Sequence, residues 1–389
     1  MIDLVLLPLL TLMFGGTVYI WVMAIASGFS LRTARHGAGD TRFAIIVPAH
    51  DEAHVIGDTV GVLQGQRYSA ERFTVYVVAD HCSDDTAAVA YAAGAVALSR
   101  NEGTRGSKGA ALSWLIGRVF ERDPSIDAFV VFDADTRVDP AYLSIVDGYL
   151  AEGAMVVQGR HAISNPCDGA YAALHDAMMR IDNRVGNQGR VNLGLSAKHM
   201  GDAITFRSPI IRRYWRESGL TEDYALRQLL LLEGIRIDYA PDAVGWGEAP
   251  MTWEIAREQR LRWLSGTRES NHRYGWRLLA SAFRSRSRIQ LDGALQALLP
   301  AYSSLVLFSS IGLGASQITR SPTMPLWSGV LVLLGVYPFY GLAIDRAPLR
   351  VWRALLFGPA FILWRSVLAL LARIPGRKFG WVRTPRRSV

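Results

Sequence analysis

The chain has 389 residues, of which 50% are hydrophobic, and a formal net charge of +8. It is longer than one ordinary domain and more apolar than an average soluble enzyme, so we expect a membrane component. Its two cysteines, Cys82 and Cys167, are too few for a disulfide framework, and no cysteine or histidine spacing in the sequence indicates zinc.

The positive charge is concentrated beside apolar segments. Arginines cluster at 32–35, 284–288 and 386–387, next to stretches that are rich in apolar residues. Anionic lipid is the simplest partner for such clusters. Because the sequence contains no nucleic-acid reader motif, we expect no nucleic-acid partner.

The first membrane segment is expected at the N-terminus, where residues 4–30 include no charged residue. A helix of that length spans the ~30 Å hydrocarbon core of a bilayer. A cleaved signal peptide is the alternative, because residues 24–26 resemble a small-residue cleavage site. However, no Lys or Arg precedes the apolar run, and Arg32 and Arg35 follow it. We therefore predict a retained anchor over 1–31, with the N-terminus outside and the following chain in the cytoplasm.

Two further uncharged stretches lie near the C-terminus, at 294–319 and 321–344. Arg320 separates them, and two prolines lie close by, as expected for a tight turn. We predict a transmembrane helical hairpin over 291–345 that returns the chain to the cytoplasm.

The last apolar segment, 351–374, carries Arg353 and Arg365, and arginine is costly in a lipid-facing helix. We predict that 346–389 forms a re-entrant or interfacial helix with a basic cytoplasmic tail. A further span, which would place the tail outside, is the alternative.

Residues 42–250 alternate short β-branched runs with helical patterns and predict a catalytic domain of the α/β class. Runs with the composition of buried parallel strands lie at 43–48, 73–78 and 128–132. Helical patterns lie near 53–66, 84–93 and 108–121. This alternation predicts βαβ units and a Rossmann-like, doubly wound sheet, in which ligands bind at the carboxyl ends of strands.

Carboxylates follow the predicted strands. Asp80 ends the second run, and Asp133 and Asp135 follow the third. Asp84 and Asp85 precede a helical pattern, where a capping role is the simpler interpretation. Because the carboxyl ends of strands gather along one edge, we expect Asp80, Asp133 and Asp135 to lie near one another.

Asp133 and Asp135 have the spacing of a metal-binding pair. Alternate carboxylates just after a strand can both reach one hard cation, which would bridge diphosphate oxygens and neutralise leaving-group charge. Upstream, Lys108 opens a predicted helix in a Gly-Ser-Lys-Gly sequence, where backbone N–H groups and the lysine suit an anion. The glycine spacing of a P-loop is absent from this sequence.

Glu222 and Asp223 begin a helical run after a glycine-containing turn. As first-turn acids they suit the helix dipole, with Thr221 as the N-cap, so a structural role alone would explain them. A catalytic role gains support from Gln-Arg-Leu-Arg-Trp at 259–263. That sequence lies in the basic, tryptophan-bearing stretch 251–290, which we predict as helices at the membrane surface.

Together these motifs resemble the inverting family-2 glycosyltransferases with a GT-A fold, in the membrane-integrated branch that includes the cellulose, chitin and hyaluronan synthases. The resemblance covers roughly residues 42–265 and continues into the C-terminal membrane segments. The motifs follow the family's order: PAHDE at 48–52, ADHCSDDT at 79–86, GSKGAAL at 106–112, DAD at 133–135, TED at 221–223 and QRLRW, fitting QxxRW, at 259–263. Such an ordered set is far more specific than any single motif.

The resemblance implies donor-binding roles at the first three motifs. Ala49 and Glu52 would line a uridine pocket. Asp80 would read the edge of the base, and Lys108 would lie near the sugar donor.

The resemblance also implies the chemical roles. Asp133 and Asp135 would hold the nucleotide diphosphate through Mg²⁺ or Mn²⁺. Asp223, with Glu222 beside it as the second catalytic candidate, would be the general base that takes a proton from the acceptor hydroxyl. One direct displacement would invert the donor's α-linkage and form a β-glycoside.

The last motif would complete the site. Gln259, Arg262 and Trp263 would close over the donor, with Arg262 stabilising the departing diphosphate and Trp263 forming the floor for the acceptor.

The expected enzyme is therefore a multi-pass protein of the inner membrane with a cytoplasmic catalytic domain. It would transfer sugar from a UDP-sugar to a glycan acceptor; transfer of one sugar to a membrane lipid, as in ceramide glucosyltransferases, is the alternative. An inactive family member that serves as a scaffold would be expected to have lost some of the matched catalytic residues, which are all present. The chain departs from the family pattern in two respects. It has fewer predicted membrane spans than the large polymer synthases, and its lysine motif reads Gly-Ser-Lys-Gly in place of Gly-Lys-Gly.

Overall fold

The computed structural model describes residues 3–29, 36–103, 106–215 and 222–373. The chain forms two compact units, which we describe separately. Among the described residues, the sheet unit is drawn from 36–165 and 196–250, and the helical unit from 3–29, 166–195 and 251–373.

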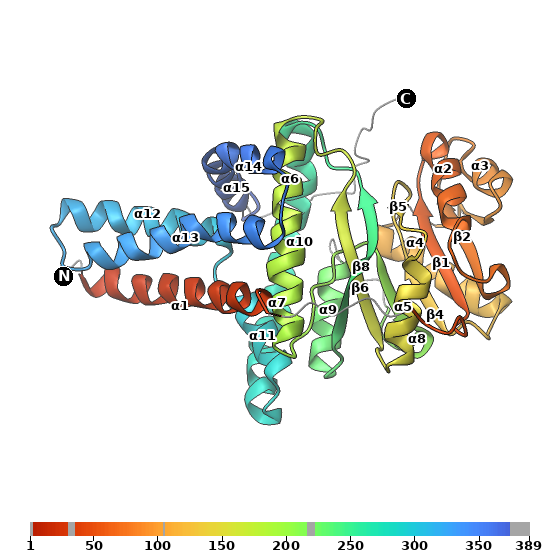
Figure 1. The fold of residues 1–389 in the computed structure, drawn as a ribbon, viewed down its shortest axis with the longest axis horizontal. Coiled ribbons are helices and arrows are strands. Elements are labelled where there is room, and N and C mark those ends of the chain that lie inside the picture. The colour runs from red at the N-terminus through yellow and green to blue at the C-terminus, as the bar shows by residue number, and fades with distance from the viewer. Residues whose placement is uncertain (1–2, 30–35, 104–105, 216–221, 374–389) are drawn as a thin grey trace. The chain divides into compact units, whose positions relative to one another are not determined.

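An eight-stranded mixed sheet forms the centre of the sheet unit, with the strand order β3-β2-β1-β4-β7-β6-β8-β5 (Figure 1). The strands are β1 (Phe43–Ala49), β2 (Phe73–Asp80), β3 (Val96–Arg100), β4 (Ala128–Val131), β5 (Arg137–Val138), β6 (Val156–Ile163), β7 (Ile204–Arg207) and β8 (Ile237–Gly247). Strands β3, β2, β1 and β4 are parallel, β7 is antiparallel to β4 and β6, and β6 is parallel to β8. Strand β5 pairs antiparallel with β8.

Helices connect these strands and cover the sheet. They are α2 (Ala53–Gln64), α3 (Thr86–Ala92), α4 (Lys108–Arg122), α5 (Tyr142–Ala151), α8 (Ser208–Tyr214) and α9 (Glu222–Leu232), with a short 3₁₀ turn, η1 (Ala70–Arg72). Apolar side chains of the central strands, such as Ile45 and Val75, are fully buried in one cluster with Ile56 and Val60 of α2. The predicted α/β architecture and its three parallel strands are therefore confirmed.

The register of the parallel strands brings their carboxyl ends to one edge of the sheet. Phe43 of β1 is level with Phe73 of β2 and with Ala128 of β4. Because the strands start level and run parallel, Asp80 at the end of β2 and Asp133 just after β4 emerge at the same edge. This is the juxtaposition that the sequence predicts.

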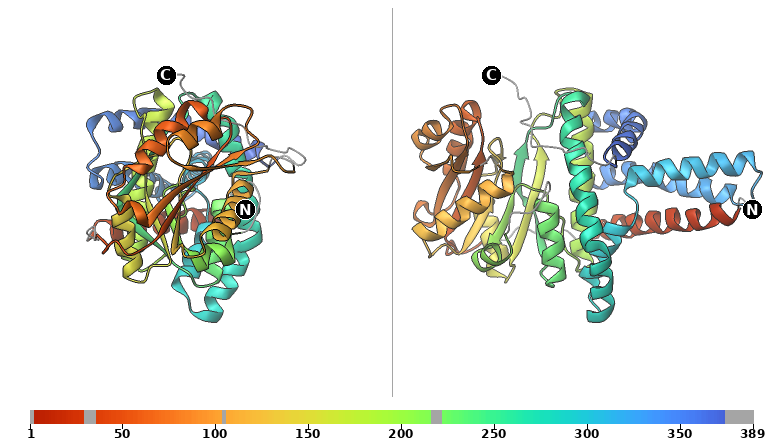
Figure 2. Two further views of the ribbon diagram at one scale, coloured as in Figure 1. Left: turned by 90° about the vertical axis from the view of Figure 1, so that its right-hand side faces the viewer. Right: turned by 180° about the vertical axis from the view of Figure 1, so that it is seen from behind.

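The helical unit contains the apolar helices of both ends of the chain. Its elements are α1 (Asp3–Ser27), α6 (Ala170–Ile181), the π-helix η2 (Asp182–Asn187), α7 (Gln188–Asn192), α10 (Trp253–Ser285), α11 (Arg288–Leu298), α12 (Tyr302–Ile318), α13 (Met324–Ile344), α14 (Leu349–Ala354), η3 (Leu355–Phe357) and α15 (Gly358–Leu371). Helices α1, α12 and α13 lie side by side (Figures 1 and 2).

Small residues allow these three helices to approach closely. A β-carbon at Gly16 of α1 would come within 2.7 Å of Leu305 in α12, and one at Gly312 of α12 would come within 2.6 Å of Trp327 in α13. Glycine at such positions is typical of helices that pack in a membrane, where van der Waals contact drives association.

Three helical segments in the described residues are long and apolar enough to cross a bilayer: Leu6–Ser27, Met324–Ile344 and Leu349–Leu371. The pair α11 and α12 would add a fourth if it forms one broken span, although the two helices are bent by 54°. The uncharged stretch 294–319 is divided between these two helices, with a break after Leu298. Pro300 lies between α11 and α12, and proline lacks the N–H that a continuous helix requires.

Residues 166–195 belong to the helical unit, although the sequence pattern favoured 42–250 as one continuous domain. A buried ion pair holds this segment there: Arg190 Nε donates to Asp292 Oδ2 at 3.1 Å. The Tyr19 hydroxyl lies 2.7 Å from both Arg190 Nη2 and Asp292 Oδ1. The network therefore ties α7 to α1 and α11, elements that are remote in the sequence.

Candidate active site

The centre of the candidate site is the first residue of α4, which Ser107 caps through a bond from the Ala110 N–H at 3.3 Å. Lys108 at that position donates from Nζ to Oδ1 of Asp133 and, at 2.7 Å, to the carbonyl oxygen of Gly201. One ammonium group thus joins the helix start, the turn after β4 and the turn before β7.

Asp133 presents its carboxylate outward, with 41% of the side chain exposed. Asp135 is half-buried two residues later, and the intervening Ala134 faces the core. The contact between Asp133 and the Lys108 ammonium shows that this carboxylate is aimed at positive charge. Two carboxylates at alternate positions are also the hard oxygen donors that Mg²⁺ and Mn²⁺ prefer, so these residues fit the expected cation.

Asp202 fixes the backbone of this motif, and sequence reasoning missed it. Its buried carboxylate accepts hydrogen bonds from the Asp133 N–H at 3.1 Å and from the Thr136 hydroxyl at 2.9 Å. The third neighbour is His161 Nδ1, at 3.2 Å. In sequence, Asp202 follows Gly201 as any turn aspartate would, so no local signal distinguishes it.

His161 and Asp202 each shift the pKa of the other. Burial opposes a charge on His161, but the hydrogen bond to Asp202 and the negative charges of Asp202, Asp133 and Asp135 outweigh it and raise the pKa of the imidazole. Burial likewise opposes ionisation of Asp202, yet His161 and Lys108 lower the pKa of this carboxyl. The site therefore places three carboxylates close to Lys108 and His161.

Asp223 lies beside the Gly201 turn. Gly201 has φ +85°, and a β-carbon built on it would be 2.9 Å from Asp223 Oδ2. The other oxygen, Oδ1, accepts the N–H of Tyr224 at 2.8 Å, as suits the first turn of α9. Asp223 and Lys108 thus flank the same residue. Glu222 begins α9, and its side chain lies outside the described residues, as does Thr221.

His199 supports the Gly201 turn from the protein interior. Its Nδ1 accepts the Gly201 N–H at 3.0 Å, and the ring packs against Phe206. Burial, together with the positive charges of Lys108 and Arg227, lowers the pKa of His199 to about 3. The ring is therefore neutral at physiological pH.

The predicted nucleoside-binding residues lie at the ends of β1 and β2. Ala49 and Glu52 are buried, and the Glu52 N–H donates to the Thr86 hydroxyl at 2.8 Å. Asp80 is also buried, and its Oδ1 is 2.9 Å from Arg100 Nη1. Sequence reasoning missed Arg100, which neutralises Asp80.

Asp84 links the two helices that follow these strands. It accepts the Thr86 N–H at the start of α3 at 3.0 Å and the Ala53 N–H at the start of α2 at 3.1 Å. The capping interpretation is therefore correct for Asp84, whereas the side chain of Asp85 makes no capping bond to α3.

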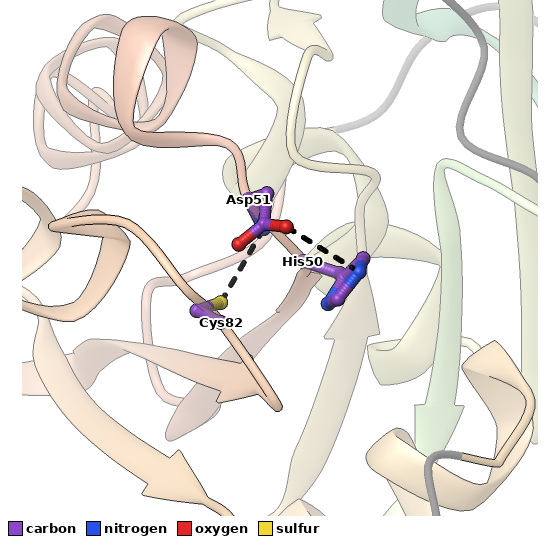
Figure 3. A group of neighbouring side chains, drawn as sticks. All are labelled: His50, Asp51 and Cys82. Atoms are coloured by element: carbon purple, nitrogen blue, oxygen red, sulfur yellow. Dashed lines mark hydrogen bonds and ion pairs between the residues drawn. The ribbon is translucent and has the colours of Figure 1, made fainter.

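The turns after β1 and β2 carry a cluster that the sequence did not predict, formed by His50, Asp51 and Cys82 (Figure 3). The Asp51 N–H donates to Cys82 Sγ at 3.4 Å, and the thiol donates to the Ala49 carbonyl oxygen at 3.6 Å. Burial raises the pKa of Cys82, so the group is a thiol rather than a reactive thiolate at neutral pH.

Gln259, Arg262 and Trp263 all lie on α10, in the helical unit. The buried Arg260, next to Gln259 in sequence, donates from Nε to the Tyr171 hydroxyl at 2.7 Å. Its Cζ lies over the Trp263 ring, 4.9 Å from the ring centroid. Arg260 is therefore a packing residue of the helical unit.

Comparison with known proteins gives concordant results. Residues 41–266 match the model of the family "Glycosyltransferase like family 2". The chain is 24% identical over 262 residues to a probable glycosyltransferase, YdaM, of Bacillus subtilis, covering 64% of this chain and 60% of that protein. It is 27% identical over 241 residues to poly-beta-1,6-N-acetyl-D-glucosamine synthase of Staphylococcus aureus, covering 58% of this chain and 54% of the synthase.

Among solved structures, the fold resembles that of the mannosyltransferase PcManGT from Pyrobaculum calidifontis, determined with GDP-Man and Mn²⁺. The TM-score is 0.60 at 16% identity, and the match covers 96% of this chain and all of the other. The sheet unit is thus a GT-A-like mixed α/β domain. With a family match over more than half of its length, the chain belongs to the family-2 glycosyltransferases.

Proposed function

We propose that this glycosyltransferase moves a sugar from a UDP-sugar to a glycan acceptor at the membrane, with a divalent cation and with inversion. The gathering of Asp133, Lys108 and Asp223 around Gly201 carries the proposal. At this turn Asp133 would bind the cation, Lys108 supplies a positive charge and Asp223 is the candidate base. Sugar transfer from a nucleotide diphosphate needs these three kinds of group.

The donor would lie along the carboxyl edge of the parallel strands. Ala49, Glu52 and Asp80 would contact the nucleoside, and Lys108 would contact the phosphates. Asp133 and Asp135 would hold Mg²⁺ or Mn²⁺, which would neutralise the charge that develops on the leaving diphosphate.

Asp223 would act on the acceptor. Its carboxylate would take the proton of the attacking hydroxyl as the new bond to the anomeric carbon forms and the bond to the diphosphate oxygen breaks. Attack opposite the leaving group inverts the anomeric centre, so an α-linked donor gives a β-glycoside. Glu222, on the same helical turn, is the second candidate.

We further infer from the family motif that Gln259, Arg262 and Trp263 act on the same reaction. Arg262 would stabilise the departing diphosphate, and Trp263 would support the acceptor sugar. By the positive-inside rule, the arginines near residue 32 would keep the catalytic domain in the cytoplasm, and the chain would lie in the inner membrane.

The decisive experiment is incubation of the purified full chain in lipid with a panel of nucleotide-sugars and Mn²⁺, followed by the mass of the product. UDP-N-acetylglucosamine is the first donor to test because the matched S. aureus relatives are synthases of a poly-N-acetylglucosamine. GDP-mannose tests the donor class of the PcManGT structure. Turnover of GDP-mannose alone would refute the UDP-sugar proposal, and a single sugar added to a lipid would refute the glycan acceptor.

A further inference from the structure

The cluster at the ends of β1 and β2 has the composition of a transition-metal site. One ligand atom each from His50, Asp51 and Cys82 lies within 4.8 Å of the others (Figure 3). Imidazole nitrogen, carboxylate oxygen and cysteine sulfur form a donor set that Zn²⁺ prefers, whereas Mg²⁺ takes oxygen ligands. We propose that His50, Asp51 and Cys82 bind Zn²⁺, at a site chemically distinct from the Asp133–Asp135 pair.

The tautomer of His50 supports this assignment. Its Nδ1 lies 2.7 Å from the carbonyl oxygen of Asp80, and because a carbonyl oxygen only accepts, Nδ1 must carry the hydrogen. In the neutral ring Nε2 then bears the lone pair, which is the usual arrangement of a metal-binding histidine with a backbone carbonyl behind it. Nε2 faces Asp51 Oδ2 at 3.6 Å, so the atom that would bind the ion lies on the side of the carboxylate.

The spacing suits a tetrahedral ion after a small adjustment. Zn–N and Zn–O bonds of about 2.0–2.2 Å at a tetrahedral angle place the two donors roughly 3.4 Å apart. The observed separation of His50 Nε2 and Asp51 Oδ2 is 3.6 Å. Cys82 Sγ lies within 4.8 Å of both donors and would have to move closer to complete the tetrahedral arrangement.

The surrounding backbone holds the ligands in place. Asp51 and His81, the residue before Cys82, both have left-handed φ values, of 54° and 52°. Residues other than glycine seldom adopt this conformation, and those that do cluster at functional sites. Ser83 fixes the other oxygen of Asp51 through its N–H at 2.6 Å, which leaves Oδ2 on the His50 side.

Ion binding would release the thiol proton of Cys82 and convert its sulfur to a thiolate. The Asp51 N–H already donates to that sulfur, so the thiolate would retain one hydrogen bond. Three protein ligands leave a fourth position for water. The ion would then join the turn after β1 to the turn after β2.

The test uses Co²⁺ as a spectroscopic substitute for Zn²⁺ in the detergent-purified full chain, stripped of metal by a chelator. Coordination by sulfur gives a thiolate-to-cobalt charge-transfer band that carboxylate-bound cobalt lacks, and Zn²⁺ should abolish the band while Mg²⁺ should not. The exposed Cys167 is the matched control. Cys82→Ser should lose the band, whereas Cys167→Ser should keep it.

Two further variants separate this site from the catalytic proposal. His50→Gln should weaken cobalt binding, and Asp135→Asn should leave the band unchanged whether or not the protein transfers sugar. Retention of the wild-type band by Cys82→Ser would overturn the assignment. So would the absence of a band in wild-type protein whose thermal unfolding is cooperative, because the contacts within the cluster would then be structural only.

Discussion

Gly201 and Asp223 are so close that a β-carbon at residue 201 would lie 2.9 Å from Asp223 Oδ2. The carbonyl oxygen of Gly201 also accepts a hydrogen bond from the Lys108 ammonium. Gly201 therefore sets the positions of both Asp223 and Lys108. A side chain at residue 201 would therefore displace the Asp223 carboxylate and strain the left-handed backbone.

The first prediction is that Gly201→Ala reduces sugar transfer more than it reduces stability. Gly234→Ala is the matched control, because Gly234 also has a positive φ, +74°, but a β-carbon there would meet no atom within 4 Å. Both variants should lose about 1–2 kcal/mol through the left-handed backbone. Only Gly201→Ala should lose transfer, measured as initial rate at saturating donor. Equal rates in the two variants would remove the proposed constraint on Asp223.

The second prediction tests Asp223 as the base. Asp223→Asn should leave donor affinity nearly unchanged while transfer falls by roughly 10²-fold or more. If Asp223 only serves the helix dipole, the change should lower stability by about 0.3–1 kcal/mol and leave turnover largely intact. Glu222→Gln, on the same turn, is the control. Near wild-type turnover in a folded Asp223→Asn protein would shift the assignment to Glu222.

The third prediction is metal dependence. Transfer should vanish in EDTA and return with Mn²⁺ or Mg²⁺, because Asp133 and Asp135 are expected to hold the cation against the diphosphate. Asp135→Asn should lose the Mn²⁺-dependent part of UDP-sugar binding, measured by calorimetry. Asp85→Asn is a suitable control, since Asp85 follows β2 but lies outside the proposed cation pair. Full activity in chelator would contradict the metal role.

The fourth prediction concerns topology. After both native cysteines are replaced by serine, Ser388→Cys, which lies outside the described residues, should resist an impermeant thiol reagent applied to intact cells. Thr319→Cys, in the exposed turn between α12 and α13, should be labelled. Labelling of Ser388→Cys from outside would refute the re-entrant or interfacial interpretation of 346–389 and would support a further span.

The fifth prediction follows from His199, whose pKa falls from 6.5 to about 3 in the folded chain. Because the unfolded chain binds this proton more readily, His199 should reduce stability increasingly as pH falls from about 6.5 toward 3. His199→Asn removes the titration and retains an acceptor for the Gly201 N–H. Its unfolding temperature should therefore fall less than that of wild type between pH 7 and pH 5, each measured in the same detergent.

The sequence determined the secondary structure around the site with good accuracy. Runs of buried β-branched residues predicted β1, β2 and β4, because a strand covered on both faces has to be apolar throughout. Local patterns also predicted that Asp80 and Asp133 lie at strand ends and that a helix starts at Lys108, because strand ends and helix starts have recognisable residues in sequence.

The tertiary structure decided what no local pattern carries. Asp202 is 66 residues from Thr136, with which it shares a hydrogen bond, and only the antiparallel pairing of β7 with β4 brings them together. Arg190 and Asp292 are 102 residues apart and form a buried pair that assigns 166–195 to the helical unit.

The cluster of His50, Asp51 and Cys82 is a second arrangement that no local sequence pattern predicts. In sequence, Cys82 lies far from His50 and lacks the short spacing of a zinc motif, so the chain gave no reason to expect a metal there. The parallel register that pairs Ala49 with Ala79 brings the two turns together. Local chemistry thus determined which residues are available in each turn, and strand pairing decided which of them meet, because hydrogen bonds between strands join residues irrespective of their distance along the chain.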